Sequence, residues 1–248
     1  MTPEPRAIQH FRSNLASVRQ LMRFDDLVLE IIAAPARALR ERLARHEIDN
    51  PRLQPDRIIQ TLDSIRQNAS LRPYYEAMHN QCLVLTVSYF GAATRALFVD
   101  AVAEGIRRGS LSLMKEHVQI AVQDLVEAEI DRVQLAAEFM ADGPDSSWQD
   151  MKSIGRAYSK VFGAAPERGE TVNDIIAAQA FRHAIVHSGG IVDRRLVGQV
   201  KNASPRSLFR SVSLDAPIRV VPDDVTLAGD QMLRYLQELN GLVEGAAI

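Results

Sequence analysis

The sequence is poor in cysteine and has no recognisable leader segment. Cys82 is the single thiol in 248 residues, so no disulfide can form within the chain and a reducing compartment is expected. Cys82 opens an apolar run, which favours a buried, inert thiol over a nucleophile. The first residues are polar, and no apolar stretch of a secretory signal follows them. We therefore expect a cytoplasmic protein.

The chain also lacks a strong charge of one sign and the common nucleotide-binding motifs. Its formal net charge of −2 argues against a general polyanion binder, because non-specific affinity for nucleic acids comes from neutralising phosphates. The patterns G-x-x-x-x-G-K-[ST], G-x-G-x-x-G and G-x-S-x-G are missing. No cofactor is therefore expected.

One hydrophobic run approaches the length of a membrane span. Residues 83–103 form the most apolar window of the chain, but Arg95 and Asp100 lie inside it. Charges in the middle of a span are costly in a bilayer. We therefore expect a buried core helix at this position and no contact with a membrane.

Apolar residues recur at 3- and 4-residue spacing along most of the chain, which predicts an all-α fold. Pro35 is expected to kink or divide the first helix, Thr171 to cap the sixth, and Asp223 or Asp224 to cap the last. The expected helices cover residues 6–46, 56–70, 80–108, about 111–140, 148–162, 172–187 and about 225–243. We interpret 1–75 as an N-terminal helical extension and 76–248 as a helical bundle domain.

The pattern changes between residues 191 and 221. β-branched residues, Gly198, Pro205 and Pro217 interrupt the helical periodicity, and residues 210–214 alternate between polar and apolar. These features predict a short irregular or β-hairpin insertion before the last helix.

A group of basic side chains marks the end of the helix expected at 172–187. Arg182, His183 and His187 come directly before Gly189 and Gly190. The last carbonyl groups of a helix carry partial negative charge and lack intrahelical partners, so cations stabilise this end. Glycine suits the left-handed residue that follows a helix. A purely structural role is therefore one interpretation of the motif.

The same residues support a second interpretation. Arg182, the polar residue after it and His187 resemble the R-x(4–6)-H signature of HEPN domains, and residues 189–193 (Gly-Gly-Ile-Val-Asp) are similar to the segment that follows this signature in prokaryotic members. The resemblance implies an all-helical, HEPN-like bundle. Many members of that family are metal-independent ribonucleases and others are not catalytic, so both alternatives stay open.

Cleavage of RNA by its own 2′-hydroxyl needs a base, an acid and positive charge on the phosphorane. Under the resemblance, His187 would transfer protons and Arg182 would stabilise the phosphate. His183 would orient His187 or contact a phosphate. The expected product is a 2′,3′-cyclic phosphate, and no metal is required. The residues expected to contact the substrate or support the site are His183, Ser188, Asp193, Arg194 and Arg195.

Helix geometry limits how these residues can cooperate. Residues five apart lie roughly 140° apart around a helix, so Arg182 and His187 converge only through a loosened final turn or a second protomer. Two facing copies would supply two guanidinium and two imidazole groups, which favours a homodimer. His183 and His187 share one face, but zinc needs three or four ligands, and no metal site is expected.

The expected partners follow from the local charge and from the resemblance. From Arg182 to Arg219, seven basic residues stand against two aspartates, a formal +5, whereas the remaining chain carries −7; this stretch suits an anionic ligand such as RNA. A toxin or phage-defence nuclease would also have an antitoxin or other regulatory protein, which the N-terminal extension would bind. The alternative functions are a non-catalytic module that binds a nucleotide or a protein, and a structural dimerisation domain.

Overall fold

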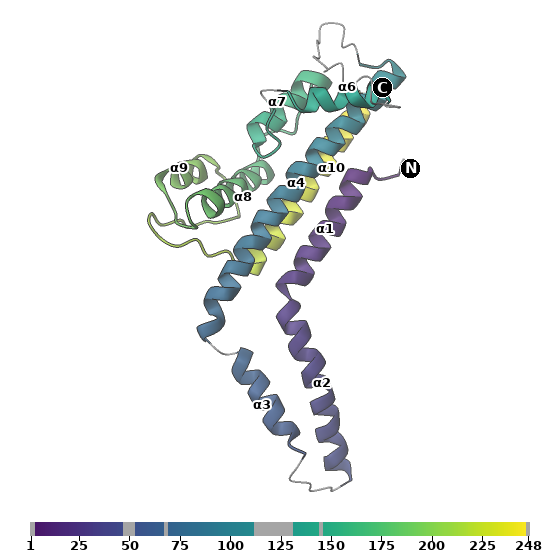
Figure 1. Ribbon diagram of the computed structural model, residues 1–248. Helices are drawn as coiled ribbons and strands as arrows, with labels where there is room; N and C mark the ends of the chain where they lie inside the picture. Colours follow the sequence, from purple (N-terminus) through teal and green to yellow (C-terminus); the bar gives the residue numbers. More distant parts are fainter. Residues whose placement is uncertain (1–2, 47–52, 67–68, 112–130, 144–145, 247–248) are drawn as a thin grey trace, which may run out of the picture.

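In the computed structural model, every regular element of the described residues is a helix (Figure 1). The structure describes residues 3–46, 53–66, 69–111, 131–143 and 146–246. The elements are α1 (Arg6–Met22), α2 (Phe24–Arg45), α3 (Pro55–Arg66), the 3₁₀ turn η1 (Ala69–Leu71), α4 (Arg72–Arg108), α6 (Arg132–Ala141), α7 (Met151–Phe162), α8 (Glu170–His187), α9 (Arg194–Asn202) and α10 (Pro222–Ala246). The all-α prediction is confirmed. Residues 112–130 of the helix expected at about 111–140 lie outside the described part. The HEPN-like arrangement of the bundle stays a prediction.

The 37-residue helix α4 forms the centre of the bundle. Helices α1, α6, α8 and α10 pack on it, and α1 and α10 run along its length (Figure 1). It begins at Arg72, earlier than expected, because the missing N–H of Pro73 costs nothing in a first turn. By length and composition α4 could cross a membrane. Its apolar residues, however, are largely covered by the other helices, as in the core of a globular protein.

Aromatic side chains attach α7 to the C-terminal half of α4. The ring of Phe98 lies edge-on to the rings of Tyr158 and Phe162, with centroids 5.4 and 5.8 Å away. The Tyr158 hydroxyl is fully buried and donates a 3.0 Å hydrogen bond to the carbonyl of Thr94. Edge-to-face contacts of this kind add to the hydrophobic gain. They fix α7, and hence the start of α8, relative to the core.

Helix α1 belongs to the main core, whereas α2 and α3 extend beyond it. Phe11, Leu15 and Val18 of α1 are buried in the large cluster around α4. Leu29, Ala33 and Leu62 form a separate small cluster between α2 and α3. We call the described residues of α2 and α3 the arm (Figure 1). The division expected after residue 75 stays a prediction, although α1 shares its core with the bundle.

The first helical segment is divided at Arg23 and not at Pro35. The Arg23 amide donates to the carbonyl of Gln20, a tightened turn that ends α1, and α2 continues through Pro35. Pro35 is exposed, so water can reach the carbonyl that its missing N–H leaves unpaired. Of the two expected effects of Pro35, a kink or a division, the division does not occur, and a kink stays a prediction.

The segment before the last helix is not a β-hairpin. It contains α9, which begins where the Asp193 carboxylate accepts a 2.7 Å hydrogen bond from the Leu196 amide. Among the described residues, extended pairing is limited to one isolated bridge between Ile191 and Pro217. Of the two predicted alternatives, an irregular segment is confirmed for residues 203–221 and the β-hairpin is wrong, because the alternating residues 210–214 belong to an irregular loop.

Two polar side chains hold that loop: buried Asp174 binds it to α8, and half-buried Arg206 binds it to the end of α9 and to itself. The Asp174 carboxylate is fully buried and accepts 2.8 Å hydrogen bonds from the amides of Ser207 and Leu208, and a 3.1 Å bond from Gln231. The guanidinium of Arg206 donates to the carbonyls of Val200, Ala203 and Phe209. These bonds satisfy backbone groups that no strand or helix pairs.

Replacing Asp174 with alanine should lower the free energy of unfolding by about 3 kcal/mol or more, because two buried donors and one half-buried donor lose their acceptor. Urea denaturation followed by circular dichroism measures this change. Asp142→Ala is the matched control, since its ion pair with Arg95 is exposed and should contribute less than about 1 kcal/mol. Equal losses for the two variants would contradict the assigned role of Asp174.

Candidate functional site

Helix α8 presents its basic end beyond the bundle while its apolar side is held in the core. Ile175, Ala178 and Phe181 are buried against the neighbouring helices. The helix begins after Gly169 and not at Thr171; the predicted cap was wrong because the Thr171 hydroxyl bonds Gln231 of α10 at 3.0 Å. Packing of α8 thus decides which of its side chains remain accessible.

The end of α8 is a regular helix up to its last residue. The Ser188 amide donates to the carbonyl of Ala184 at 2.9 Å, the spacing of an ordinary α-helical bond. Gly189 and Gly190 follow with φ of +63° and +73°, the left-handed region that glycine adopts without strain. The final turn is not loosened, so one chain offers Arg182 and His187 on different sides of the helix.

Three basic side chains meet at this end. The rings of His183 and His187 lie 4.6 Å apart between centroids, which confirms that they share one face. Arg195 of α9 places its Nη1 3.2 Å from Nε2 of His183. Because a guanidinium can only donate, Nε2 must accept, and the neutral ring carries its proton on Nδ1. Sequence spacing predicted the histidine pair but offered no signal for the contact with Arg195.

These neighbours change the protonation of His183. Burial lowers the pKa of His183 below its usual value, and the charges of Arg195, His187 and Arg182 lower it further, while Asp193 opposes them. A lowered pKa keeps the imidazole neutral at pH 7. With Nε2 accepting from Arg195, the neutral ring of His183 offers its Nδ1–H as a hydrogen-bond donor.

Ser188 and Asp193 are engaged in local structure. The Ser188 hydroxyl donates to the Asp193 carboxylate at 2.9 Å, and the other carboxylate oxygen caps α9. The Leu196 amide and the Ser188 hydroxyl lower the pKa of Asp193. These bonds position Arg195 beside His183, and a direct contact of Ser188 or Asp193 with substrate stays a prediction.

The two residues of the R-x(4)-H pattern differ in exposure. His187 is exposed at the helix end, as is Arg194 on the first turn of α9. Arg182 is half-buried, and its Nε has no hydrogen-bond partner among the described residues. Because the regular helix places Arg182 and His187 roughly 140° apart, the single chain does not bring the predicted pair together on one phosphate.

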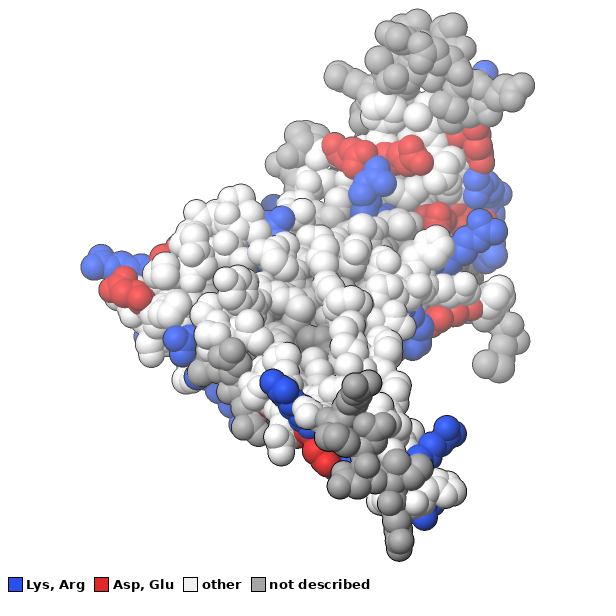
Figure 2. All heavy atoms as spheres, turned by 60° about the horizontal axis from the view of Figure 1, so that its bottom comes forward, with Lys and Arg blue, Asp and Glu red and all other residues white. Residues whose placement is uncertain are grey.

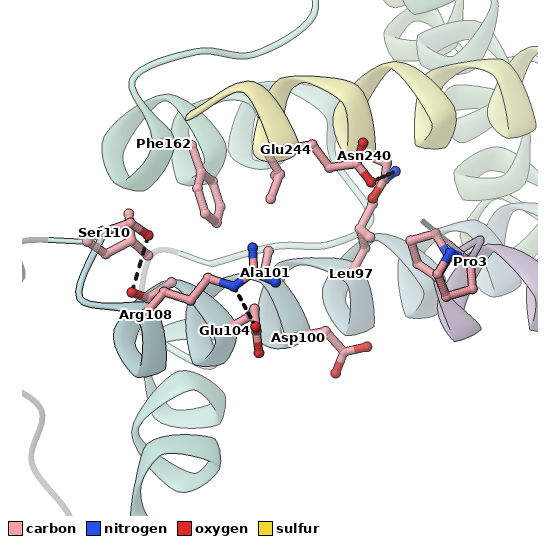
Figure 3. A pocket seen from close by; sticks show the side chains of 14 residues that line it. Pro3, Leu97, Asp100, Ala101, Glu104, Arg108, Ser110, Phe162, Asn240 and Glu244 are labelled. Atoms are coloured by element: carbon pink, nitrogen blue, oxygen red, sulfur yellow. Dashed lines mark hydrogen bonds and ion pairs between the residues drawn. The ribbon is translucent and has the colours of Figure 1, made fainter. Parts of the chain in front are cut away.

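Two cavities lie near the ends of the bundle. A cavity of about 480 Å³ adjoins α8 on its other side and is lined partly by Phe181, Phe209, Arg210 and Arg219. Another, of about 450 Å³, lies near the chain ends, where Asp100, Glu104 and Glu244 contribute carboxylates (Figure 3). Neither of these two cavities is lined by Arg182 or His187.

Among the residues that the structure describes, no three histidine, cysteine, aspartate or glutamate side chains gather closely enough to hold a metal ion. Metal independence of any reaction stays a prediction. Comparison with protein-family models, with curated proteins and with solved structures finds no match. The resemblance to HEPN domains thus rests on the motif residues alone.

Replacing Arg195 with alanine should raise the pKa of His183, because a neighbouring positive charge is removed. Titration of the imidazole protons by NMR would follow this change, with the wild-type midpoint expected below about 6.5. Arg194→Ala serves as the control, since Arg194 is not among the charges that shift His183. An unchanged midpoint in Arg195→Ala would contradict the contact seen between α8 and α9.

Proposed function

We propose that this chain is a metal-independent endoribonuclease of the HEPN type, which cleaves RNA through attack of the 2′-hydroxyl. The observation that carries the proposal is the imidazole pair of His183 and His187 beside Arg195, at the free end of α8. Imidazoles can accept and donate protons near neutral pH, and arginine stabilises phosphate charge. Two imidazoles and one guanidinium therefore lie together on one small surface, which supports a role in proton transfer next to a phosphate.

Each side chain has an assigned role in the proposed reaction. His187, which is exposed, takes the proton of the 2′-hydroxyl or gives one to the leaving 5′-oxygen. Arg182 binds the phosphate and stabilises its developing negative charge. His183 is held by Arg195 with Nδ1 protonated, and orients His187 or donates to a phosphate oxygen. The bond from the 5′-oxygen to phosphorus breaks, and a 2′,3′-cyclic phosphate forms.

The site would be completed by a second copy. Since α8 is regular to its end, Arg182 of one protomer would act with His187 of the other across a two-fold axis. In such an isologous dimer, the pair formed by Arg182 of one protomer and His187 of the other occurs twice. Two composite sites would then share one cleft and one RNA strand.

The surrounding charge supports an anionic substrate. The formal +5 between Arg182 and Arg219 lies in a chain of net charge −2, so attraction of phosphate is local to α8, α9 and the loop that follows. A cytoplasmic toxin or phage-defence role, with an antitoxin or other regulatory protein as partner, is part of the same proposal.

Purified wild-type protein should cleave total RNA in the presence of EDTA and leave 2′,3′-cyclic phosphate ends. Arg182→Ala and His187→Ala should each reduce the rate by about 100-fold or more, the usual range for loss of a proton-transfer group. Gel analysis of the RNA and of its end groups measures both effects. His10→Ala and Arg12→Ala, on α1, are matched controls and should retain full activity.

Mixing the two inactive variants tests the shared cleft. A heterodimer of Arg182→Ala with His187→Ala retains one composite site, so random exchange of subunits should restore about a quarter of wild-type activity. No recovery after demonstrated exchange would contradict action across the interface.

If the purified wild type does not cleave RNA, the remaining interpretation is a non-catalytic module in which Arg182 and His187 are structural. In that case the same variants should change only stability, by up to ~1 kcal/mol for each charge removed from the helix end.

A further inference from the structure

The loop between α9 and α10 borders a cavity of about 480 Å³, together with Phe181 of α8 and Asp224 of α10. A cavity of this size is within the range of binding sites for small molecules. It is separate from Arg182 and His187, neither of which lines it. The proposed cleavage chemistry therefore does not account for this cavity.

The backbone of the loop is strained at one wall of the cavity. Phe209 has a φ of +47°, a left-handed conformation that is costly for a bulky residue. Its ring stacks on the ring of Phe181, with centroids 3.7 Å apart and planes within 14°. The Asp174 carboxylate holds the amides of the two residues before it. Such conformations persist only where the surroundings fix them, and they cluster at functional sites. The wall at Phe209 is thus part of the fold.

The chain after Phe209 carries hydrogen-bond donors that are not used within the protein. Residues 210–213 line the cavity one after another. In the described part of the chain, neither the amides of 211–213 nor the hydroxyls of Ser211 and Ser213 donate to another residue. The exposed guanidinium of Arg210 likewise makes no hydrogen bond or ion pair there. A ligand with several acceptor oxygens would satisfy these donors.

The charged residues around the cavity are two arginines and one carboxylate. Arg210 and Arg219 line it, as does Asp224, which gives a formal balance of +1. Arg219 lies 3.5 Å from Glu76, but its side chain is 56% exposed, so this ion pair is weak and can be exchanged for one with a ligand. Asp224 accepts a 3.3 Å hydrogen bond from the Val221 amide. Two guanidinium groups with an excess of neutral donors suit a phosphate monoester.

The surface as a whole does not attract anions. The formal net charge of the chain is −2. On the face shown in Figure 2, acidic and basic side chains lie near one another around a broad uncharged area. Binding of an anionic ligand therefore needs a local group of donors, such as the one around this cavity.

The rest of the cavity wall indicates what the phosphate is attached to. Phe209, Val212, Ala216 and Pro217 make this part apolar. The hydroxyls of a simple sugar phosphate would lose hydrogen bonds against such a wall. A nucleobase has apolar faces that can pack there, and its edge carries N–H groups that a carboxylate can accept.

We propose that this cavity binds a nucleoside phosphate. The phosphate lies on Arg210 and Arg219, the base packs against Val212 and Pro217, and Asp224 accepts a hydrogen bond from the base or the ribose. The same chemistry is offered by a free nucleotide and by one nucleotide of an RNA strand. The proposal concerns binding alone, so it holds whether or not the end of α8 cleaves RNA.

Calorimetric titration of the full-length protein with AMP, GMP, CMP and UMP tests the proposal. At least one should bind, and Arg210→Ala should weaken its binding by about 10-fold or more, because a charge-assisted hydrogen bond is lost. Ser213→Glu should weaken it by a similar factor, since the new carboxylate would repel the phosphate. Arg234→Ala is the matched control: Arg234 is an exposed arginine of α10 that does not line the cavity, and this variant should keep the wild-type affinity. Circular dichroism should show unchanged helix content, because Arg210 and Ser213 are exposed.

Further probes separate the parts and the source of the ligand. Inorganic phosphate and ribose 5-phosphate should bind at least about 10-fold more weakly than the best nucleotide, because they cannot use the apolar wall. A short 2′-deoxyoligonucleotide cannot be cleaved through a 2′-hydroxyl. If it binds more tightly than the monophosphates and depends on Arg210, the natural ligand is part of a strand; if it binds more weakly, the ligand is a free nucleotide.

Other outcomes would overturn the proposal. These are no binding of any nucleotide or of the oligonucleotide at millimolar concentration, equal affinities of Arg210→Ala and Arg234→Ala, or equal affinities for inorganic phosphate and the nucleotides. His187→Ala should bind the nucleotide as wild type does, because His187 does not line the cavity. Failure of the nuclease proposal and failure of this one are therefore distinguishable.

Discussion

Burial of α4 is the constraint on which the rest of this structure depends. An apolar helix of 37 residues cannot remain in water, because each large side chain left exposed forgoes about 1.5–3 kcal/mol. Helices from both ends of the chain cover it: α1 precedes it in sequence, and α10 follows 113 residues after its end. The segment around Trp148 also packs closely on α4. A Cβ added to Gly91 of α4 would lie 2.6 Å from the carbonyl oxygen of Trp148.

The chemistry of α8 is a consequence of that packing. Ile175 and Phe181 turn one side of the helix inward, and His183 and His187 are left on a side that α9 only partly covers. Asp193 determines where α9 begins, so a helix cap places Arg195 beside His183. The regular last turn separates Arg182 from His187. A site that needs both residues is thus incomplete in one chain, which is why symmetry enters the proposed mechanism.

Self-association enters the proposed mechanism for a geometric reason. One chain holds Arg182 and His187 on different sides of a regular helix end, so these two residues can act on one phosphate only across two protomers. The arm has a small core of its own, Leu29, Ala33 and Leu62, whereas Phe24, Leu27 and Ile31 face solvent.

The sequence by itself determined what depends on neighbours three or four residues away: the helices, the buried Cys82, and the shared face of His183 and His187. Tertiary structure decided the break at Arg23, the loop held by Asp174 and Arg206, and the contact of Arg195 with His183. Periodicity shows which side of a helix is apolar, but not which distant residue it will meet. The alternation at 210–214 is a local pattern, and it suggested a hairpin. The interaction that holds the preceding loop residues is not local, because the Asp174 carboxylate that binds them lies more than thirty residues earlier in the chain.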